Sequence, residues 1–392
     1  MANGGQLRRL SITVLSVLTI GFGAARLLPG PVAPEAGAAP TATTSTDPPA
    51  GNSPAVDSAR GNSTTSGPSA TSVPPTTDRP AGTITLAFAG DVNFAERTAD
   101  RLAADPASVF GPAAPALAAA DLTMVNLETA IATGGEPEPK SFTFRAPPAA
   151  LGALRNAGVD VASMANNHAA DYGAVGIAES LAAIRSSGFP VIGFGADHAA
   201  AGAPFRALVG GVPVAIFAAS QVPDRTQNVW TATAGTPGIA SAQDPQLVEN
   251  VRSAAQAGET VIVFLHWGTE YLSCPDGDQR RLADQLAAAG ATAVIGAHAH
   301  VLQGAGWRAD GTYVAYGLSN YLWWRSFGNE QDDNGVLTLT IADRRVVHAE
   351  FAPAHLDDTG VPVPATGAEA ERINQQWERV RTCADLAAEP PR

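Results

Sequence analysis

The sequence predicts an α/β fold in which most strands run parallel. From Thr83 onward, short apolar segments alternate with amphipathic segments of helical period, and this alternation is typical of βαβ units. Towards the C-terminal end, strand-like segments follow one another without an intervening helix, which indicates antiparallel pairing. We therefore expect a mixed sheet or a second sheet.

The expected strands are short and apolar, and several are followed directly by a polar residue. In chain order they cover residues 84–89, 122–127, 159–165, 191–194, 261–265, 293–295, 313–316, 336–341 and 346–351. Residues 207–219 are expected to form a hairpin that turns at Gly210 and Gly211. The expected helices, two of them closed by a glycine, cover residues 149–157, 173–187, 245–257 and 279–289.

Six potential metal ligands follow the ends of five of these strands. They are Asp91, Glu128, Asn167, His266, His298 and His300. Because ligands of open α/β sheets bind at the carboxyl ends of strands, we expect these side chains to meet. Carboxylates, imidazoles and an amide without a thiolate suit a divalent metal such as Mn, Fe or Zn, and also Mg. Two ions at one such site can clamp both oxygens of a displacement reaction.

The charge of the chain restricts its partners. The 392 residues carry a formal net charge of −13, which argues against a nucleic-acid partner because phosphate backbones need clustered Lys and Arg. The same balance makes a long polyanion a less obvious ligand, unless a local basic patch overrides it.

The N-terminal region has the composition of an export segment and a linker. Arg8 and Arg9 precede an apolar run, so residues 1–29 are expected to be a signal peptide or an N-terminal membrane anchor. Residues 30–82, rich in Pro, Ala, Thr and Ser, are expected to be a disordered linker. Residues 83–358 would then form the folded domain outside the cytoplasmic membrane, in the cell envelope or secreted, and residues 359–392 a C-terminal tail.

The chain has two cysteines, Cys274 and Cys383. In an oxidising compartment such a pair is a natural disulfide, which would staple the C-terminal tail to a loop. Two free thiols are the alternative.

Six segments form an ordered set of motifs. They read LAFAGDVNF, VNLETAI, SFTFRAPP, ANNHAADYG, VIVFLHWGTEY and VIGAHAHVLQG, and they span residues 83–324. In this order they resemble the motifs of the CapA (poly-γ-glutamate capsule) family, which is similar to the calcineurin-like metallophosphoesterases. The resemblance implies a metallophosphatase-like four-layer αββα sandwich with two mixed sheets and one or two divalent ions.

The resemblance also implies roles for individual residues. Carried over to this chain, it places Asp91 and His300 at the first metal and Glu128 between both, with the second held by Asn167, His266 and His298.

Four more residues receive roles in the same way. His168, beside a metal ligand, is implied as the general acid or the group that stabilises the leaving oxygen, and Asp171 as the residue that orients it. Lys140 and Arg145 are implied to meet an anionic substrate. The structural alternatives are a helix N-cap for Asp171 and a surface salt bridge for Arg145.

The chain departs from the wider phosphoesterase pattern at two positions. Asn93 stands where those enzymes have a histidine, and Glu128 where they have an aspartate, a change that the CapA family shares. We keep Asn93 among the candidate ligands. Loss of an imidazole weakens the first site, so a mononuclear centre stays open.

Two functions follow from these expectations. The first is an exported, metal-dependent hydrolase of the phosphoesterase type, acting on or in the synthesis of an extracellular anionic polymer such as poly-γ-glutamate. Its bond would be a phosphoester or an amide, and its partner that polymer or a small anionic substrate. The alternative is a non-catalytic subunit of a membrane capsule synthase that binds, exports or anchors the polymer.

Overall fold

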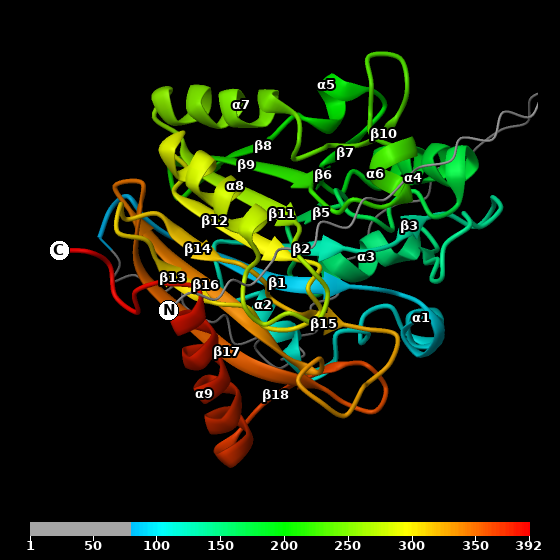
Figure 1. The fold of residues 1–392 in the computed structure, drawn as a ribbon. Coiled ribbons are helices and arrows are strands. Elements are labelled where there is room, and N and C mark those ends of the chain that lie inside the picture. The colour runs from blue at the N-terminus through cyan, green and yellow to red at the C-terminus, as the bar shows by residue number, and fades with distance from the viewer. Residues whose placement is uncertain (1–79) are drawn as a thin grey trace, which may run out of the picture. The chain divides into compact units, whose positions relative to one another are not determined.

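Two mixed β-sheets lie face to face in the computed structural model, which describes residues 80–392 (Figure 1). The first sheet has the strand order β18–β17–β16–β1–β2–β5–β6, with β15 also paired to β1. The second has the order β13–β14–β12–β11–β9–β8. In the first sheet β1, β2 and β5 are parallel neighbours, and in the second β9, β11 and β12 are parallel neighbours.

The strands have the following bounds. Those of the first sheet are β1 (Thr83–Val92), β2 (Leu122–Leu127), β5 (Val161–Ser163), β6 (Val191–Ile192), β15 (Asn320–Leu322), β16 (Asp333–Ala342), β17 (Arg345–Leu356) and β18 (Pro362–Pro364). Those of the second are β8 (Phe205–Val209), β9 (Val212–Ser220), β11 (Thr260–His266), β12 (Ala293–Ala297), β13 (Ala305–Trp307) and β14 (Tyr313–Ala315). Two short pairs lie apart, β3 (Ala130–Ile131) with β4 (Arg145–Ala146) and β7 (Phe194–Gly195) with β10 (Gly238–Ile239).

Of the helices, the final one follows the last strand and the others lie between these strands in the sequence. The helices are α1 (Glu96–Ala104), α2 (Ala114–Leu117) preceded by a 3₁₀ turn (Gly111–Ala113), α3 (Ala149–Asn156), α4 (Gly173–Ser187), α5 (His198–Ala201), α6 (Arg225–Val229), α7 (Pro245–Gln256), α8 (Gly277–Ala288) and α9 (Gly367–Cys383).

Three apolar layers hold the fold together, because successive side chains of a strand point to opposite faces. Phe88 of β1 and Phe264 of β11 pack between the two sheets. On its other face the first sheet packs against α3, which contributes Leu151. The outer face of the second sheet packs Val263 against Leu286 of α8. The predicted four-layer αββα sandwich with two mixed sheets is therefore confirmed.

The predicted hairpin is also present. Strands β8 and β9 are joined by Gly210 and Gly211, which have φ angles of +53° and +84°. Both angles lie in the left-handed region, where glycine is unstrained, and this is the backbone that a tight two-residue hairpin turn requires.

The C-terminal stretch, residues 359–392, forms β18 and α9 within the folded unit. Trp377 of α9 stacks on Phe351 with ring centroids 4.1 Å apart, and Ile373 is fully buried. The predicted disulfide is confirmed: Cys274 and Cys383 are bonded, with their Cα atoms 5.7 Å apart.

The predicted export segment, residues 1–29, and nearly all of the predicted linker, residues 30–82, lie outside the described residues. Among the helices of residues 80–392, none has the length and apolar character needed to cross a membrane.

Candidate metal centre

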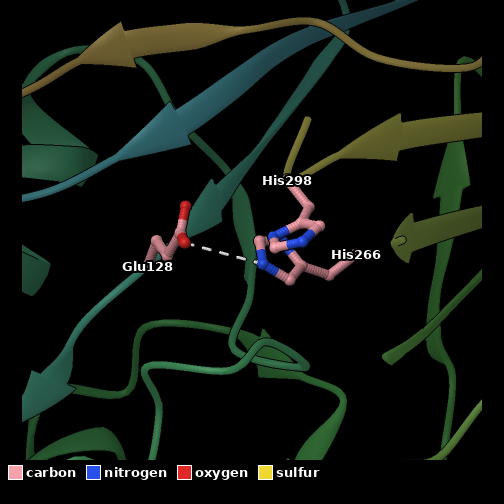
Figure 2. Close-up of side chains that lie close together, drawn as sticks. All are labelled: Glu128, His266 and His298. Atoms are coloured by element: carbon pink, nitrogen blue, oxygen red, sulfur yellow. Dashed lines mark ion pairs between the residues drawn. The ribbon is translucent and has the colours of Figure 1, made fainter. Parts of the chain in front are cut away.

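The carboxyl ends of five parallel strands bring the predicted ligands together. Strands β1, β2 and β5 are neighbours in the first sheet, and β11 and β12 are neighbours in the second. The two sets of strand ends meet across the sandwich, as Figure 2 shows for Glu128 of one sheet facing His266 and His298 of the other. This is where the topology of an α/β protein places a ligand site.

Three overlapping groups have the spacing of metal ligands. They are Glu128 with His266 and His298, Asp91 with Glu128 and His300, and Glu270 with His298 and His300. Within each group the ligand atoms lie within 4.8 Å of one another. Glu128 belongs to the first two groups and so lies between two possible ion positions.

Glu128 is fully buried, and its two carboxylate oxygens accept no hydrogen bond within residues 80–392. Its Oε1 lies 3.5 Å from Nε2 of His266 and 3.8 Å from Nε2 of His168. Burial raises the pKa of Glu128 well above its usual range, and the negative charge of Asp91 raises it further. A carboxylate in this position is stable in its ionised form only when a cation compensates it.

Asp91 joins the two sheets at the site. In the strand register it pairs with Asn126 on one side and Asn320 on the other. Asn126 Nδ2 donates a hydrogen bond to Asp91 Oδ1 (2.8 Å), and the backbone N–H of His298 donates to Oδ2 (3.2 Å). Oδ2 is also 3.3 Å from Nδ1 of His300. Asp91 therefore fixes the loop after β12 against the end of β1.

The His298–His300 loop has an unusual backbone. His298 and His300 have φ angles of 97° and 55°, in a region that side chains other than glycine seldom adopt. Just before this loop, Gly296 of β12 permits a close approach of the neighbouring backbone, since a Cβ there would lie 2.0 Å from the carbonyl oxygen of Tyr316. Such strain persists where the surroundings hold it, and it gathers at functional sites. Here it directs both imidazoles of a short loop towards the carboxylates.

The protonation of the imidazoles suits ligation. Burial lowers the pKa of His266 and of His298 well below the usual value, and the neighbouring histidines lower both further. Neutral imidazole is the form that binds metals. Nδ1 of His298 is buried and has no hydrogen-bond partner among the described residues. Burial also lowers the pKa of His300, but the hydrogen bond and charge of Asp91 outweigh it, so the net shift is upward.

Asn167 reaches the same cluster. Its Oδ1 lies 2.8 Å from Nε2 of His266. Its backbone carbonyl accepts hydrogen bonds from the hydroxyl of Thr226 (2.6 Å) and from the ammonium of Lys140. The loop that carries Asn167 is thus held from outside the cluster.

A buried chain of polar contacts holds His168. Its Nδ1 lies 2.5 Å from Oδ2 of Asp171, which also accepts a hydrogen bond from the backbone N–H of Phe144 (2.7 Å). Oδ1 of Asp171 accepts a hydrogen bond from Lys140 Nζ (2.8 Å). Burial lowers the pKa of His168, and Asp171 partly offsets the shift. The ring is held so that Nε2 faces Glu128.

Three predicted site residues have other contacts. Both ends of the Asn93 side chain bond to backbone: Nδ2 donates to the Glu128 carbonyl (3.1 Å), and Oδ1 accepts from the N–H of Ala95 (2.8 Å). Asn93 therefore positions Glu128 instead of offering a free oxygen to an ion.

Lys140 is mostly buried, with ion pairs to Asp171 and to Asp224 (3.3 Å). Arg145 is exposed, lies 4.6 Å over the ring of Tyr172 and contacts no residue of the cluster in the described part of the chain. The geometry does not favour either as the main anion-binding group.

Three residues at the site were not among the predicted ligands, and of these Glu270 could equally have faced solvent on sequence grounds. Glu270 joins the cluster from the loop after β11, and Asn126 and Asn320 hold Asp91 and His300. The signal for Asn126 was a polar residue inside an otherwise apolar strand. The pairing of Asn320 with β1 depends on register and leaves no local pattern.

The donor set fits a divalent cation. The buried carboxylates of Asp91 and Glu128 lie within ligand distance of three imidazoles, the amide oxygen of Asn167 lies beside one of these rings, and none of the ligands is a thiolate. Such N/O sets are typical of Mn, Fe and Zn.

Two facing mixed sheets with a carboxylate–imidazole cluster at their strand ends define a protein of the metallophosphoesterase-like class. The model of the family described as bacterial capsule synthesis protein PGA_cap matches residues 85–323, and the chain belongs to this family, the CapA family that the motifs predicted.

Curated relatives show the same similarity. The chain is 26% identical over 255 residues to the PGA biosynthesis protein CapA of Bacillus subtilis, covering 64% of this chain and 66% of that one. It is 32% identical over 234 residues to a probable polyglutamine synthesis accessory protein of Mycobacterium tuberculosis, covering 54% of this chain and 59% of that one. The chain thus spans 66% and 59% of the lengths of these two relatives.

Among solved structures, a hypothetical protein from Thermus thermophilus is similar to this chain with a TM-score of 0.43 and 19% identity. The match covers 69% of this chain and 98% of that one.

Proposed function

We propose that this protein is a metal-dependent hydrolase of the cell envelope that acts in the synthesis of a capsule or poly-glutamate polymer. The two curated relatives are named for PGA biosynthesis and polyglutamine synthesis, which supports the polymer class. Export by the N-terminal segment and a location outside the cytoplasmic membrane are part of the same proposal. The presence of the disulfide supports an oxidising compartment.

One observation carries the metal site on which the hydrolase assignment depends. Among residues 80–392, both carboxylate oxygens of Glu128 and Nδ1 of His298 are buried without a hydrogen-bond partner, and the two residues belong to one group with the spacing of metal ligands. Buried polar atoms are nearly always paired, and each unpaired one carries a free-energy penalty of about 1–3 kcal/mol. A divalent cation relieves all three at once, so the cluster is built to bind one.

The ligands divide between two ion positions that share Glu128. Asp91 and His300 would hold one ion, and His266, His298 and Asn167 the other. Once bound, the ion supplies Lewis-acid polarisation of a phosphoryl or carbonyl oxygen.

The other residues of the site handle the proton and the approach of the substrate. Asp171 fixes Nδ1 of His168, so Nε2 is the atom that exchanges a proton with the leaving group. Lys140 donates hydrogen bonds to Asp171 and to the backbone carbonyl of Asn167. These bonds fix the position of the general acid His168, through Asp171, relative to the metal ligand Asn167. The rings of Phe144 and Trp323, with centroids 4.5 Å from His168 and 4.9 Å from His300 respectively, exclude water from this side.

Hydrolysis by the full chain tests the proposal. The purified protein, loaded with Mn²⁺ or Zn²⁺, is incubated with bis-p-nitrophenyl phosphate and with a γ-glutamyl anilide. We expect wild type to release nitrophenol or the aniline. The variant Glu128→Gln should lose this activity, whereas His348→Ala, a matched control at an exposed position of β17, should retain it. Absence of turnover by metal-loaded wild type on both substrates contradicts the hydrolase and favours a non-catalytic polymer-binding role.

A further inference from the structure

Aromatic side chains gather beside the metal centre. We call this group the aromatic rim; it consists of Phe142, Phe144, Tyr271, Trp323 and Trp324. Trp323 and Tyr271 have ring centroids 4.9 Å and 6.2 Å from His300, and Phe144 lies 4.5 Å from His168. Phe142 and Tyr271 are each 53% exposed, so the rim also faces solvent.

Arg325 extends this rim. Its guanidinium lies 4.2 Å over the ring of Trp324 and 4.5 Å over that of Phe327. Trp324 in turn lies 6.3 Å from Phe144, which contacts His168. Arg325 therefore stands at the edge of the metal centre.

Within residues 80–392, Arg325 has no anionic partner. Its guanidinium forms no hydrogen bond or ion pair with residues 80–392, and its Nε is buried. A half-buried guanidinium without a carboxylate is costly unless a partner arrives, because Arg offers five donors in a fixed planar fork. Lys140, by contrast, is already paired with two aspartates.

The loop around Arg325 is rigid without using that arginine. Asp332, an acidic residue of this loop, accepts hydrogen bonds from the backbone N–H groups of Phe327 (2.8 Å) and Gly328 (2.6 Å) and from the hydroxyl of Ser326 (2.8 Å). Its carboxylate is saturated by these donors. Glu330, the other acidic residue of the loop, lies 3.9 Å from the guanidinium of Arg379. The guanidinium of Arg325 is thus held in place by rings and left free for an incoming acceptor.

We propose that Arg325, held on the rings of Trp324 and Phe327, binds a carboxylate of the substrate at the edge of the metal centre and selects anionic over neutral chains. This inference rests on the proposed function for the identity of the reacting centre. Arginine stacked on aromatic rings is pre-organised for bidentate contact with a planar carboxylate. Because the net charge of the protein is −13, a local cation of this kind favours the approach of an anionic substrate.

The test measures binding, so that it does not depend on turnover. Isothermal titration calorimetry of the full chain uses a γ-linked glutamate pentapeptide and the same pentapeptide with all its carboxylates amidated. Each is titrated into metal-free and Mn²⁺-loaded protein. The metal-free arm separates Arg325 from direct coordination of a carboxylate by the ion.

Three variants complete the design. Arg325→Gln removes the charge, and Arg325→Lys keeps it without the planar fork. Arg345→Gln removes an exposed charge at the start of β17. We expect wild type to prefer the carboxylated peptide and Arg325→Gln to lose about tenfold in affinity for it, with no change for the amidated peptide. Arg325→Lys should lose less, and Arg345→Gln should bind like wild type.

Equal binding of both peptides by wild type, or an unchanged preference in Arg325→Gln, overturns the inference. If circular dichroism shows that Arg325→Gln is misfolded, the Arg325→Lys variant provides the test. It must then show a smaller preference for the carboxylated peptide over the amidated peptide than wild type does. If the proposed hydrolase function is wrong, the hydrolysis assay shows no turnover. The calorimetric result for Arg325 does not depend on that assay.

Discussion

Removing the disulfide should lower the free energy of unfolding by about 4 kcal/mol. The bond joins Cys274 to Cys383 across a sequence separation of 109 residues. The chain-entropy relation gives about 4.7 kcal/mol for a loop of roughly 100 residues, which is an upper value because strain and residual structure reduce it.

The native state should keep its shape in the Cys274→Ser/Cys383→Ser variant. Arg280 donates hydrogen bonds to the carbonyls of Cys383 (2.5 Å) and Ala384 (3.2 Å), which hold the end of α9 without the bond. Backbone hydrogen bonds between Trp307 and Ala387 (2.9 and 2.8 Å) fix the segment beyond it. The loss therefore arises from the unfolded chain, which gains conformational freedom.

Urea unfolding followed by circular dichroism measures the effect. Wild type under reducing conditions should behave like the double-serine variant, and the variant should not respond to reductant. A difference below about 1 kcal/mol between oxidised wild type and the variant would refute the chain-entropy reasoning for this loop.

Three other changes have outcomes that the structure specifies. Asp171→Asn should lower kcat at least about 100-fold with bound metal unchanged, because His168 loses its fixed orientation; steady-state kinetics beside metal analysis checks this, and an unchanged kcat would contradict the role of the pair. Trp377→Ala should cost about 3–5 kcal/mol in urea unfolding, since it removes a buried ring stacked on Phe351; a loss near zero would mean that α9 does not stabilise the sheet. Gly296→Ala should reduce both thermal stability and metal content, because its Cβ would lie 2.0 Å from a backbone carbonyl oxygen; wild-type values for both would show that the loop can adjust.

Much of the sandwich could be predicted because its strands are short, apolar and well separated by helices. The strand over Leu122–Leu127 and the helix over Gly173–Ser187 have the expected bounds. Helix α9 was missed because its long polar face dominates the composition of the tail. Its buried residues Ile373, Trp377 and Val380 nevertheless recur at helical spacing and could have indicated it.

The candidate ligands could be predicted because each follows a strand end, and strand ends of both sheets converge. What could not be predicted depends on contacts between distant segments. The ion pairs of Lys140 with Asp171 and Asp224 turn an expected substrate contact into a positioning group. In the same way, the absence of an ion-pair partner for Arg325 among residues 80–392 depends on which side chains surround it in space, and its neighbours in the sequence do not indicate it.

The metal content of the full chain tests the central claim most directly. Wild type, Glu128→Gln and the control His348→Ala are reconstituted with Mn²⁺ or Zn²⁺, freed of excess ion and measured by elemental mass spectrometry. The account predicts at least one tightly held ion in wild type and in His348→Ala, and a clear loss in Glu128→Gln. Wild type that stays metal-free after reconstitution, or a Glu128→Gln variant that retains the full complement, would contradict it.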